Sequence, residues 1–320
     1  MSYAHAADLL DDIFLTAGFG TDESRICIKE LLDAEWRGKP SYGLELVPHV
    51  ASWRSQKLGE PEVRHEGPAS AFVEGNQGLG PVVAAFAMDV ALKLAASAGV
   101  AFVGVRNKWP WLTGGYHVRR AAEEGFVAAT WSAGVSIVAP HGGVRPVFGT
   151  NPFAIAAPSA GGPVVLDTAI TSAPASAIRD AKRRGEPLPE GAAVDRAGRP
   201  TRDPVAARKG AMLPFGGHRG SGLAMMIELL GGAWVGGKTG TSHPGPRGFV
   251  YLVAGAGLFG FGSELPDVAE GLVRDMVAAA DLPGEVHIPG RNPVDFAEPR
   301  EVDDEVVARL TALSSSRGGS

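Results

Sequence analysis

The amino-acid sequence predicts an α/β protein, and three observations support this class. The chain of 320 residues is 45% hydrophobic and 20% charged, as expected of a folded globular protein. Segments with the period of a strand alternate with segments of helical period along most of the chain. At roughly 100–200 residues per domain, the length indicates two domains with a substantial core.

The first third of the chain predicts a helical hairpin followed by a strand, a helix and a second strand. Apolar positions at helical spacing occupy residues 6–35, and the hairpin turn falls before Thr21 or Asp22, either of which suits a helix cap with Glu23 in the first turn. Residues 54–68 are polar and are expected to be irregular. The elements expected next are a short strand at 71–73, a helix at 82–98 that begins with Pro81, and a buried strand at 100–105.

The rest of the chain continues the alternation. Helices are expected at 116–124 and 172–184, and strands at 127–132, 136–138, 153–157 and 164–167. Residues 185–209 are rich in Pro and Gly and predict a surface loop. Residues 220–234 form the most apolar helix, with Glu228 as its charge, and are expected to be buried in a core or an interface. A strand at 249–254, helices at 267–280 and 303–313, and a disordered tail at 314–320 complete the prediction.

Composition and motifs argue against several classes of protein. Thirty basic and 35 acidic residues give a net charge of −5 without a basic block, which disfavours nucleic-acid binding. The eight histidines lack metal-ligand spacing, so no metal site is expected. Neither a nucleophile elbow nor a P-loop is present.

Compartment and membrane association are predicted from equally simple features. The longest uncharged apolar run, 248–262, is shorter than the roughly 20 residues of a membrane helix. The single Cys27 lies among helical apolar positions, which predicts a buried thiol rather than a nucleophile. The acidic N-terminal segment is unlike a signal peptide. We therefore expect a cytoplasmic protein.

Two glycine-rich segments are candidate cofactor loops. Gly255, Gly257 and Gly260 match a dinucleotide fingerprint, but Pro266 and its neighbours interrupt the required helix, so a turn is expected. The loop 216–222 precedes the apolar helix and contains Arg219, which predicts either an anion site or a glycine-rich cap with a solvated arginine. His141 lies in a third glycine-containing loop and is either a ligand contact or a structural residue.

Asp167 ends an apolar strand and is followed by Thr168. Ligands bind at the carboxyl ends of strands in α/β sheets, so a ribose or amide contact is one interpretation of Asp167. An N-cap of the next helix is the other.

Several segments, taken in order, resemble landmarks of the type 2 malate/L-lactate dehydrogenase family. They are GVAFVGVRN (99–107), APHGG (139–143), FGTNPFAIAAP (148–158), VVLDTAIT (164–171), RRGEPLPEGAAVDRAGRPTRDP (183–204), LPFGGHRGSGLAMMIELLGG (213–232) and IPGR (288–291). The family also contains ureidoglycolate and sulfolactate dehydrogenases and piperideine/pyrroline-2-carboxylate reductases. The similarity extends from residue 6 to about residue 300, and the order and spacing of the segments carry it.

The resemblance implies a non-Rossmann α/β homodimer that binds NAD or NADP in an interdomain cleft, with an active site formed partly across the dimer. The implied units are an N-terminal helical segment (1–55), a dimerisation and substrate domain (56–118 and 250–320) and an inserted cofactor-binding domain (119–249). By position, the implied cofactor contacts are Gly134, Asn151, Asp167, Thr168, Ala169, His218, Arg219, Gly220 and Arg291. Arg219 stands where the family usually has Lys.

The residues that resemble the family's catalytic positions differ from its pattern. Tyr42 stands where the family has a histidine, and Leu46 where it has an arginine. The second family histidine falls near Pro110, between Trp109 and Trp111. Reduction of a 2-oxo acid needs a proton donor and a cation for the carboxylate. We predict Tyr42 or His117 as the proton donor, and Arg54, Lys57, Lys108 or His117 as possible replacements for the missing groups.

The sequence therefore predicts an NAD(P)H-dependent oxidoreductase that reduces a carbonyl or imine carbon of a small molecule. The aromatic replacements and Leu46 predict a bulkier or less charged substrate than pyruvate or oxaloacetate. The alternative is a family fold used for a non-redox reaction, such as that of a lyase or cyclase, or for ligand binding. Loss of the catalytic groups favours the alternative, whereas the segments 164–171 and 213–222 favour the oxidoreductase.

Overall fold

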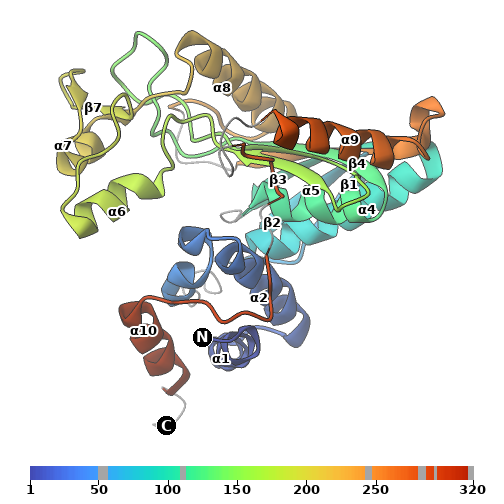
Figure 1. Cartoon of the computed structure of the whole chain (residues 1–320), viewed down its shortest axis with the longest axis horizontal. Helices are drawn as coiled ribbons and strands as arrows, with labels where there is room; N and C mark the ends of the chain where they lie inside the picture. Colours follow the sequence, from blue (N-terminus) through green and yellow to red (C-terminus); the bar gives the residue numbers. More distant parts are fainter. Residues whose placement is uncertain (50–56, 109–112, 242–246, 280–285, 292–293, 316–320) are drawn as a thin grey trace.

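The computed structural model of the chain describes residues 1–49, 57–108, 113–241, 247–279, 286–291 and 294–315. Within these residues, seven strands form one mixed sheet in the order β1-β2-β3-β10-β4-β5-β6 (Figure 1). The strands are β1 (Glu62–Glu66), β2 (Ser70–Gly78), β3 (Val100–Lys108), β4 (Phe126–Ser132), β5 (Phe153–Ala157), β6 (Val164–Thr168) and β10 (Gly248–Gly255). β2 and β3 are parallel, and the other neighbours are antiparallel.

Helices surround this sheet, and a second, three-stranded sheet lies apart from it. The α-helices are α1 (Tyr3–Thr16), α2 (Thr21–Trp36), α4 (Gly80–Ala98), α5 (Gly114–Glu123), α6 (Ser176–Arg184), α7 (Pro204–Lys209), α8 (His218–Gly231), α9 (Leu265–Ala278) and α10 (Asp304–Ser315). Short 3₁₀ helices are η1 (Pro40–Tyr42), η2 (Leu44–His49), η3 (Ala233–Val235) and η4 (Ala256–Phe259). The small sheet has the order β8-β7-β9, with β7 (Ala193–Val194), β8 (Pro200–Thr201) and β9 (Ala211–Met212).

The main core lies between the sheet and the helices α4 and α5. Val103 and Val105 of β3 and Tyr251 of β10 pack with α4 residues such as Met88. Among the described helices, α4 is long and apolar enough to cross a membrane, but half of its apolar window is buried inside the protein. Its apolar composition therefore serves the core, as the predicted helix at 82–98 implied.

The N-terminal hairpin has a core of its own, which α10 completes. Leu10 and Phe14 of α1 pack with Leu31 and Trp36 of α2 and with Leu310 of α10, so the first and the last helix of the chain lie together (Figure 1). The predicted hairpin is confirmed, and Cys27 is buried in it as predicted. The predicted cap was wrong, because α2 already begins at Thr21.

Gly20 is the N-cap of α2, and its backbone N–H donates to the Glu23 carboxylate at 3.2 Å. The acidic first turn that the sequence predicted therefore caps the helix through the side chain of Glu23, whose negative charge also suits the positive end of the helix dipole.

Four predicted segments differ from the structure and need correction. β1 lies inside the polar stretch 54–68, and its solvent-exposed side chains explain why its pattern was missed. The predicted loop 185–209 contains β7, β8 and α7. Residues 136–138 form no regular strand, and Val138 instead makes isolated bridges. Ser315 ends α10, which overlaps the start of the predicted tail, and residues 316–320 lie outside the described residues.

One continuous sheet runs through two of the predicted units, whose boundaries remain a prediction. The boundary after residue 118 falls inside α5, and β4, β5 and β6 pair in the same sheet as β1, β2 and β3. β10 joins the two groups, because it pairs with β3 on one side and β4 on the other. The part that stands apart in Figure 1 is smaller and contains α6, α7 and the second sheet.

α8 is buried on one side alone. Ala224, Ile227 and Glu228 are covered, and the side chains of Met225 and Leu229 are exposed. Of the two expected settings for helix 220–234, complete burial in a core of this chain is therefore corrected, and burial in an interface stays a prediction.

Candidate active site at one edge of the main sheet

The candidate site residues gather at one edge of the main sheet. Ser132 of β4 lies opposite Phe249 of β10, and Phe153 of β5 lies opposite Thr168 of β6. The carboxyl ends of β3, β4 and β6 therefore meet at this edge with the amino ends of β5 and β10. Loops that leave such an edge form the usual ligand crevice of an α/β protein.

Unusual backbone conformations are concentrated at the same edge. Among the described residues, the non-glycine residues with positive φ are Asn76 (49°), Gln77 (51°), Asn107 (61°) and Asn151 (41°). Asn76 and Gln77 lie in the irregular end of β2, Asn107 is near the end of β3, and Asn151 precedes β5. Backbone strain of this kind is typical of functional sites, because the surrounding structure must hold it in place.

Asn151 holds the loop that follows β4. Its fully buried side-chain oxygen accepts the backbone N–H of Gly134 at 3.0 Å, and its Nδ2 donates to Ala224 O at 3.1 Å and to Glu228 Oε1 at 3.0 Å. The same Glu228 carboxylate accepts the N–H of Gly149 and of Gly240, both at 3.2 Å. The predicted cofactor residues Gly134 and Asn151 thus lie together, and Glu228, which the sequence showed as the charge of an apolar helix, fixes their loops to α8.

Asp167, Thr168 and Ala169 lie beside the loop at the start of α8. Phe215 N donates to Ile170 O and Ser172 N donates to Leu213 O, both at 2.9 Å, so the two segments run next to each other. Gly220 is required where this loop enters α8, because a Cβ atom there would lie 2.1 Å from Phe215 O of the same loop.

The amino end of α8 has the properties of an anion site. Gly216 and Gly217 have φ of 58° and 60°, and no side chain caps the helix at Gly217. His218 and Arg219 are exposed at this end. The ring of His141 lies 6.2 Å from that of His218, centroid to centroid. The glycine backbone, the positive end of the helix dipole and these side chains suit a diphosphate, so the residues present fit a dinucleotide.

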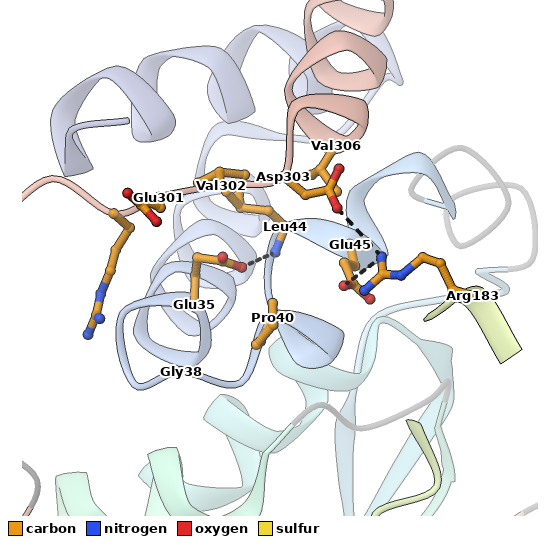
Figure 2. Close-up of a pocket in the computed structure, with 11 residues that line it drawn as sticks. Glu35, Gly38, Pro40, Leu44, Glu45, Arg183, Glu301, Val302, Asp303 and Val306 are labelled. Atoms are coloured by element: carbon orange, nitrogen blue, oxygen red, sulfur yellow. Dashed lines mark hydrogen bonds and ion pairs between the residues drawn. The ribbon is translucent and has the colours of Figure 1, made fainter. Parts of the chain in front are cut away.

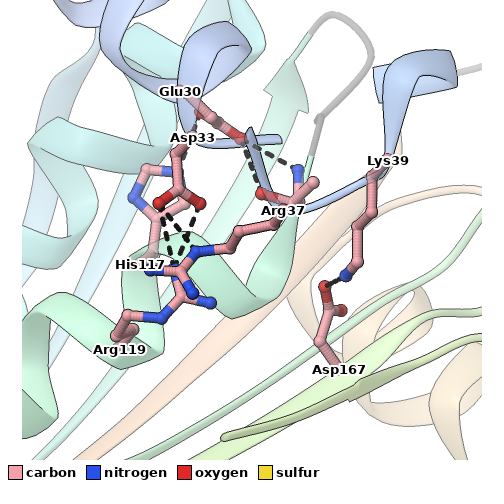
Figure 3. A network of polar contacts seen from close by, with 8 residues as sticks. Glu30, Asp33, Arg37, Lys39, His117, Arg119 and Asp167 are labelled. Atoms are coloured by element: carbon pink, nitrogen blue, oxygen red, sulfur yellow. Dashed lines mark hydrogen bonds and ion pairs between the residues drawn. The ribbon is translucent and has the colours of Figure 1, made fainter. Parts of the chain in front are cut away.

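The structure joins the predicted catalytic Tyr42 to the predicted cofactor contact Asp167. Tyr42 ends η1 and is 37% exposed, and the partial burial of its phenol, followed by the negative charge of Asp167, raises the pKa of Tyr42. Lys39 directly precedes η1, and its Nζ lies 2.5 Å from Asp167 Oδ2 (Figure 3). The sequence missed Lys39, because its partner is 128 positions away and no motif marks it.

The other predicted catalytic residues have no described contact with Tyr42 or Asp167, although the backbone of Lys108 lies at the same edge of the sheet. His117 is fully buried on α5, with Nε2 3.2 Å from Glu30 Oε2 (Figure 3). Lys108 is the last residue of β3, opposite Gly78. Lys57 is held by the carboxylates of Glu23 and Glu60. Arg54, Trp109, Pro110 and Trp111 lie outside the described residues.

Arg291 is separated from the other predicted cofactor residues. Its guanidinium donates to Ser159 Oγ at 2.7 Å and to Gly161 O at 2.6 Å, and it forms an ion pair with Glu270 of α9. Hydrogen bonds from Ser159 and Arg291 lower the pKa of Glu270. Ser159 and Gly161 lie in the turn between β5 and β6, at the end of β6 opposite to Asp167, so this chain does not bring Arg291 to the candidate site.

Two further features do not contribute binding residues to this edge. Gly255, Gly257 and Gly260 surround the short η4 and begin no long helix, which confirms the predicted turn. In the part of the chain that the structure describes, no three His, Cys, Asp or Glu side chains are grouped to hold a metal ion.

A pocket lies between the N-terminal helices, α6 and the segment before α10, and Glu35, Glu45, Arg183 and Asp303 contribute to its lining (Figure 2). Arg183 lies 3.7 Å from Glu45 and 3.9 Å from Asp303, and Arg179 Nη2 donates to Glu45 at 2.8 Å. These ion pairs connect α6 to η2 and α10. Tyr42 and Asp167 are outside the lining, so we assign the pocket to the packing of these elements.

Comparisons with known proteins agree with this geometry. A model of the malate/L-lactate dehydrogenase family matches residues 1–308. The chain is 32% identical to an L-sulfolactate dehydrogenase of Methanocaldococcus jannaschii, over 97% of this chain and 95% of that protein. It is 34% identical to a Δ1-pyrroline-2-carboxylate/Δ1-piperideine-2-carboxylate reductase of Pseudomonas syringae pv. tomato, over 89% of this chain and 88% of that protein.

Solved structures give the same result. The crystal structure of the Pseudomonas syringae Δ1-piperideine-2-carboxylate reductase matches with a TM-score of 0.88 and 30% identity, over 98% of this chain and 99% of that one. The sulfolactate dehydrogenase from Methanocaldococcus jannaschii matches with a TM-score of 0.88 and 28% identity, over 99% and 97% of the two chains. The predicted α/β fold and the predicted resemblance are confirmed.

Proposed function

This chain belongs to the malate/L-lactate dehydrogenase family, and on that premise we propose that it is an NAD(P)H-dependent oxidoreductase that reduces the carbonyl or imine carbon of a small substrate. Its relatives are dehydrogenases and reductases, which supports oxidoreductase chemistry in general. The observation that carries the proposal is the meeting of Tyr42, Lys39 and Asp167 beside the anion-binding end of α8.

We assign the cofactor to the segments at this sheet edge. Arg219, His218 and the amino end of α8 hold the diphosphate, the loop at Gly134 and the run from Asp167 to Ala169 line the remainder, and Asn151 positions the Gly134 loop. The bound nicotinamide supplies the hydride. Both NAD and NADP remain candidates, and a relative named (2R)-3-sulfolactate dehydrogenase (NADP(+)) is 39% identical over 65% of the chain.

Tyr42 is the proton donor in this proposal. A carbonyl oxygen that receives a hydride becomes an alkoxide and needs a proton from a group nearby. Burial and Asp167 raise the pKa of Tyr42, so its phenol keeps the proton at neutral pH. An imine substrate makes a smaller demand, because an iminium nitrogen already carries its proton. The fully buried position of His117 favours Tyr42 of the two predicted donors.

We further propose that the chain works as a cytoplasmic homodimer. α9 has no buried residue, and its apolar side chains, including Leu272 at 62% exposure, face away from this chain's core together with Phe259 at 82%. Exposed apolar side chains of this kind suit an association site, and symmetric pairing with a second copy covers them on both subunits. The buried free thiol of Cys27 fits a reducing compartment.

Titration with NADH and NADPH tests the cofactor assignment directly. Nicotinamide fluorescence and thermal stability are measured together, and binding of either cofactor is followed by turnover assays with Δ1-piperideine-2-carboxylate, Δ1-pyrroline-2-carboxylate and hindered 2-oxo acids. Micromolar binding and oxidation of the cofactor by one of these classes is the expected result. A protein that binds neither cofactor at millimolar concentration overturns the redox proposal and leaves a non-redox lyase, cyclase or binding function.

A further inference from the structure

The turn that carries Tyr42 is tied by charge contacts at both of its ends. Before the turn, Lys39 Nζ lies 2.5 Å from Asp167 Oδ2, near the end of β6. After it, the carboxylate of Glu45 in η2 accepts Arg179 Nη2 of α6 at 2.8 Å. Since α6 is the next helix after β6, both contacts reach one segment of the chain, which begins with the predicted cofactor contacts 167–169.

Glu45 is the acceptor that two arginines of α6 share. Arg183 Nη1 lies 3.7 Å from its other carboxylate oxygen and 3.9 Å from Asp303 Oδ2 (Figure 2). The side chain of Glu45 is 15% exposed, whereas those of Arg179 and Arg183 are 54% and 44% exposed. The contact is therefore a small network around a largely buried carboxylate, which holds its geometry better than an isolated surface ion pair.

The turn itself is fixed to the N-terminal helices. The backbone N–H of Tyr42 donates to Lys39 O, and the N–H of Leu44 donates to Glu35 Oε2 of α2, both at 2.9 Å. Glu35 is buried, so this bond anchors the turn on α2. The contact between Glu45 and α6 consequently sets how far Tyr42 stands from the segment after β6.

Ion pairs rather than apolar packing join α6 to the turn. Among the described residues, the hydrophobic cluster of the N-terminal helices contains no residue of α6, whose buried Ala181 packs in a separate small cluster. Burial and Asp167 raise the pKa of Tyr42, and the positive charge of Arg179 opposes them. The ion pairs of Glu45 therefore place α6 beside the phenol.

We propose that Glu45 is a positioning residue: by holding the two arginines of α6, it keeps the phenol of Tyr42 at the distance from the segment after Asp167 that proton transfer needs. The inference rests on the proposed function, in which Tyr42 donates the proton, and Glu45 takes no part in the chemistry itself. Proton transfer requires the donor within roughly 2.6–3.2 Å of the acceptor. A small separation of η1 from α6 therefore slows the chemical step, while the diphosphate stays bound at the amino end of α8.

Three variants remove the contact in different ways. Glu45→Gln keeps the size of the side chain and removes its charge, Arg179→Gln with Arg183→Gln removes both partners, and the triple variant combines these changes. Glu186→Gln is the matched control, because Glu186 binds Arg184 at 2.7 Å beside the end of α6, within two residues of the chain. All variants are compared with the wild-type protein by amide hydrogen exchange without cofactor, and by steady-state reduction of the substrate that the turnover assays identify.

Glu45→Gln is expected to speed amide exchange in residues 42–46 about three- to fivefold, as loss of a small ion-pair network predicts. Its kcat is expected to fall about tenfold, while KM and the Kd of the cofactor change less than about twofold. The triple variant is expected to be no slower than Glu45→Gln, because the three charges act as one contact. High salt is expected to lower kcat of the wild-type protein more than that of Glu45→Gln, which has no charge to screen. Glu186→Gln is expected to match the wild-type protein in each measurement.

The outcomes separate this inference from the proposed function. A wild-type protein that binds neither cofactor refutes the proposed function. Unchanged exchange in residues 42–46 of Glu45→Gln overturns the inference on its own, because that measurement needs no cofactor. If the wild-type enzyme is active, and Glu45→Gln keeps its kcat with only a lower melting temperature, Glu45 is a structural link and the inference is also overturned. If Glu45→Gln does not fold, the variant without Arg179 and Arg183 decides, because these side chains are half exposed and an unchanged kcat there contradicts the inference.

Discussion

The imidazole Nε2 of His117 lies 3.2 Å from Oε2 of Glu30, and both side chains are completely buried. The other oxygen of Glu30 accepts the backbone N–H of Thr113, the N-cap of α5, at 2.8 Å. One carboxylate of α2 therefore fixes both the start of α5 and the histidine one turn along it. Because α5 begins at the candidate site edge, this contact holds the N-terminal helices against that edge.

We expect His117 to contribute to stability rather than to proton transfer. His117→Phe removes the bond to Glu30 and is expected to lower the free energy of unfolding by about 1–3 kcal/mol, while kcat changes little. Urea denaturation and steady-state kinetics measure the two effects. His65→Phe, on the exposed strand β1, serves as the control. A large fall in kcat with unchanged stability would make His117 the proton donor after all.

Tyr42→Phe is expected to remove the proton donor while keeping the shape of the site. The predicted result is a fall in kcat of roughly 10²- to 10⁴-fold, with the Kd for NADH or NADPH unchanged. An imine substrate is expected to lose less than a carbonyl substrate, because its nitrogen is already protonated. Equal turnover by the variant and the wild-type protein on both substrate classes would contradict the assignment.

The pH dependence of the rate of reduction distinguishes a phenol from an imidazole as the proton donor. Burial and Asp167 raise the pKa of Tyr42, so the donor stays protonated below its ordinary value of about 10. The rate is expected to stay level up to about pH 9 and to fall only as the pH passes the raised pKa, where the phenolate has no proton to give. A donor with the ordinary pKa of histidine, about 6.5, gives a fall between about pH 6 and 8 instead.

The raised pKa of Tyr42 also makes the folded state less stable at high pH. The folded state favours the neutral phenol of Tyr42, so above about pH 10 the unfolded chain ionises first and stability decreases. Rates measured above that pH therefore need a parallel measurement of the folded fraction. The rates measured below that pH, where the protein stays folded, decide between the two donors.

Arg219→Ala is expected to weaken cofactor binding about tenfold, as loss of one charge-assisted contact predicts. Arg219→Lys is expected to keep most of the affinity, because the charge at the amino end of α8 remains. Titration by nicotinamide fluorescence at two salt concentrations measures the effect, and Arg25→Ala, an exposed arginine of α2, is the control. Unchanged affinity for both cofactors would contradict the assignment of the diphosphate to the amino end of α8.

Leu272→Lys tests the proposed homodimer. A lysine in the exposed apolar face of α9 places like charges at a symmetric contact, so the variant is expected to be a monomer by light scattering after gel filtration. Val205→Lys introduces the same charge at an exposed apolar residue of α7 and is expected to leave the association state unchanged. A wild-type protein that is monomeric at micromolar concentration would refute the dimer.

The sequence predicted the long elements well and the exposed ones poorly. α4, β3 and β10 are buried runs with a clear period, and their predicted ranges lie within the observed helix and strands. β1 has almost entirely exposed side chains, so no pattern of burial distinguishes it from a loop. α7 was missed because its six residues are too few to show a helical period.

The candidate site was predicted as separate residues rather than as an arrangement. Tyr42 and Asp167 were identified from a motif and a strand end, and nothing in the linear order shows that the charge of one acts on the other. Lys39 has no motif, and its role depends on a contact that only the folded chain creates. Arg291 was predicted as a cofactor contact because it lies in a segment that resembles the family. The sequence does not show that Arg291 forms an ion pair with Glu270, away from the candidate site.

The central position of β10 also determines when the protein can fold. β10 pairs with β3 on one side and with β4 on the other. The part β1-β2-β3 and the part β4-β5-β6 therefore cannot join into one sheet until residues 248–255 have left the ribosome. Contacts of such long sequence separation slow folding, and the two open edges expose apolar strands in the meantime. Synthesis that stops before β10 therefore yields a chain whose main sheet is divided into two unpaired parts and whose core lacks Phe249, Tyr251 and Val253.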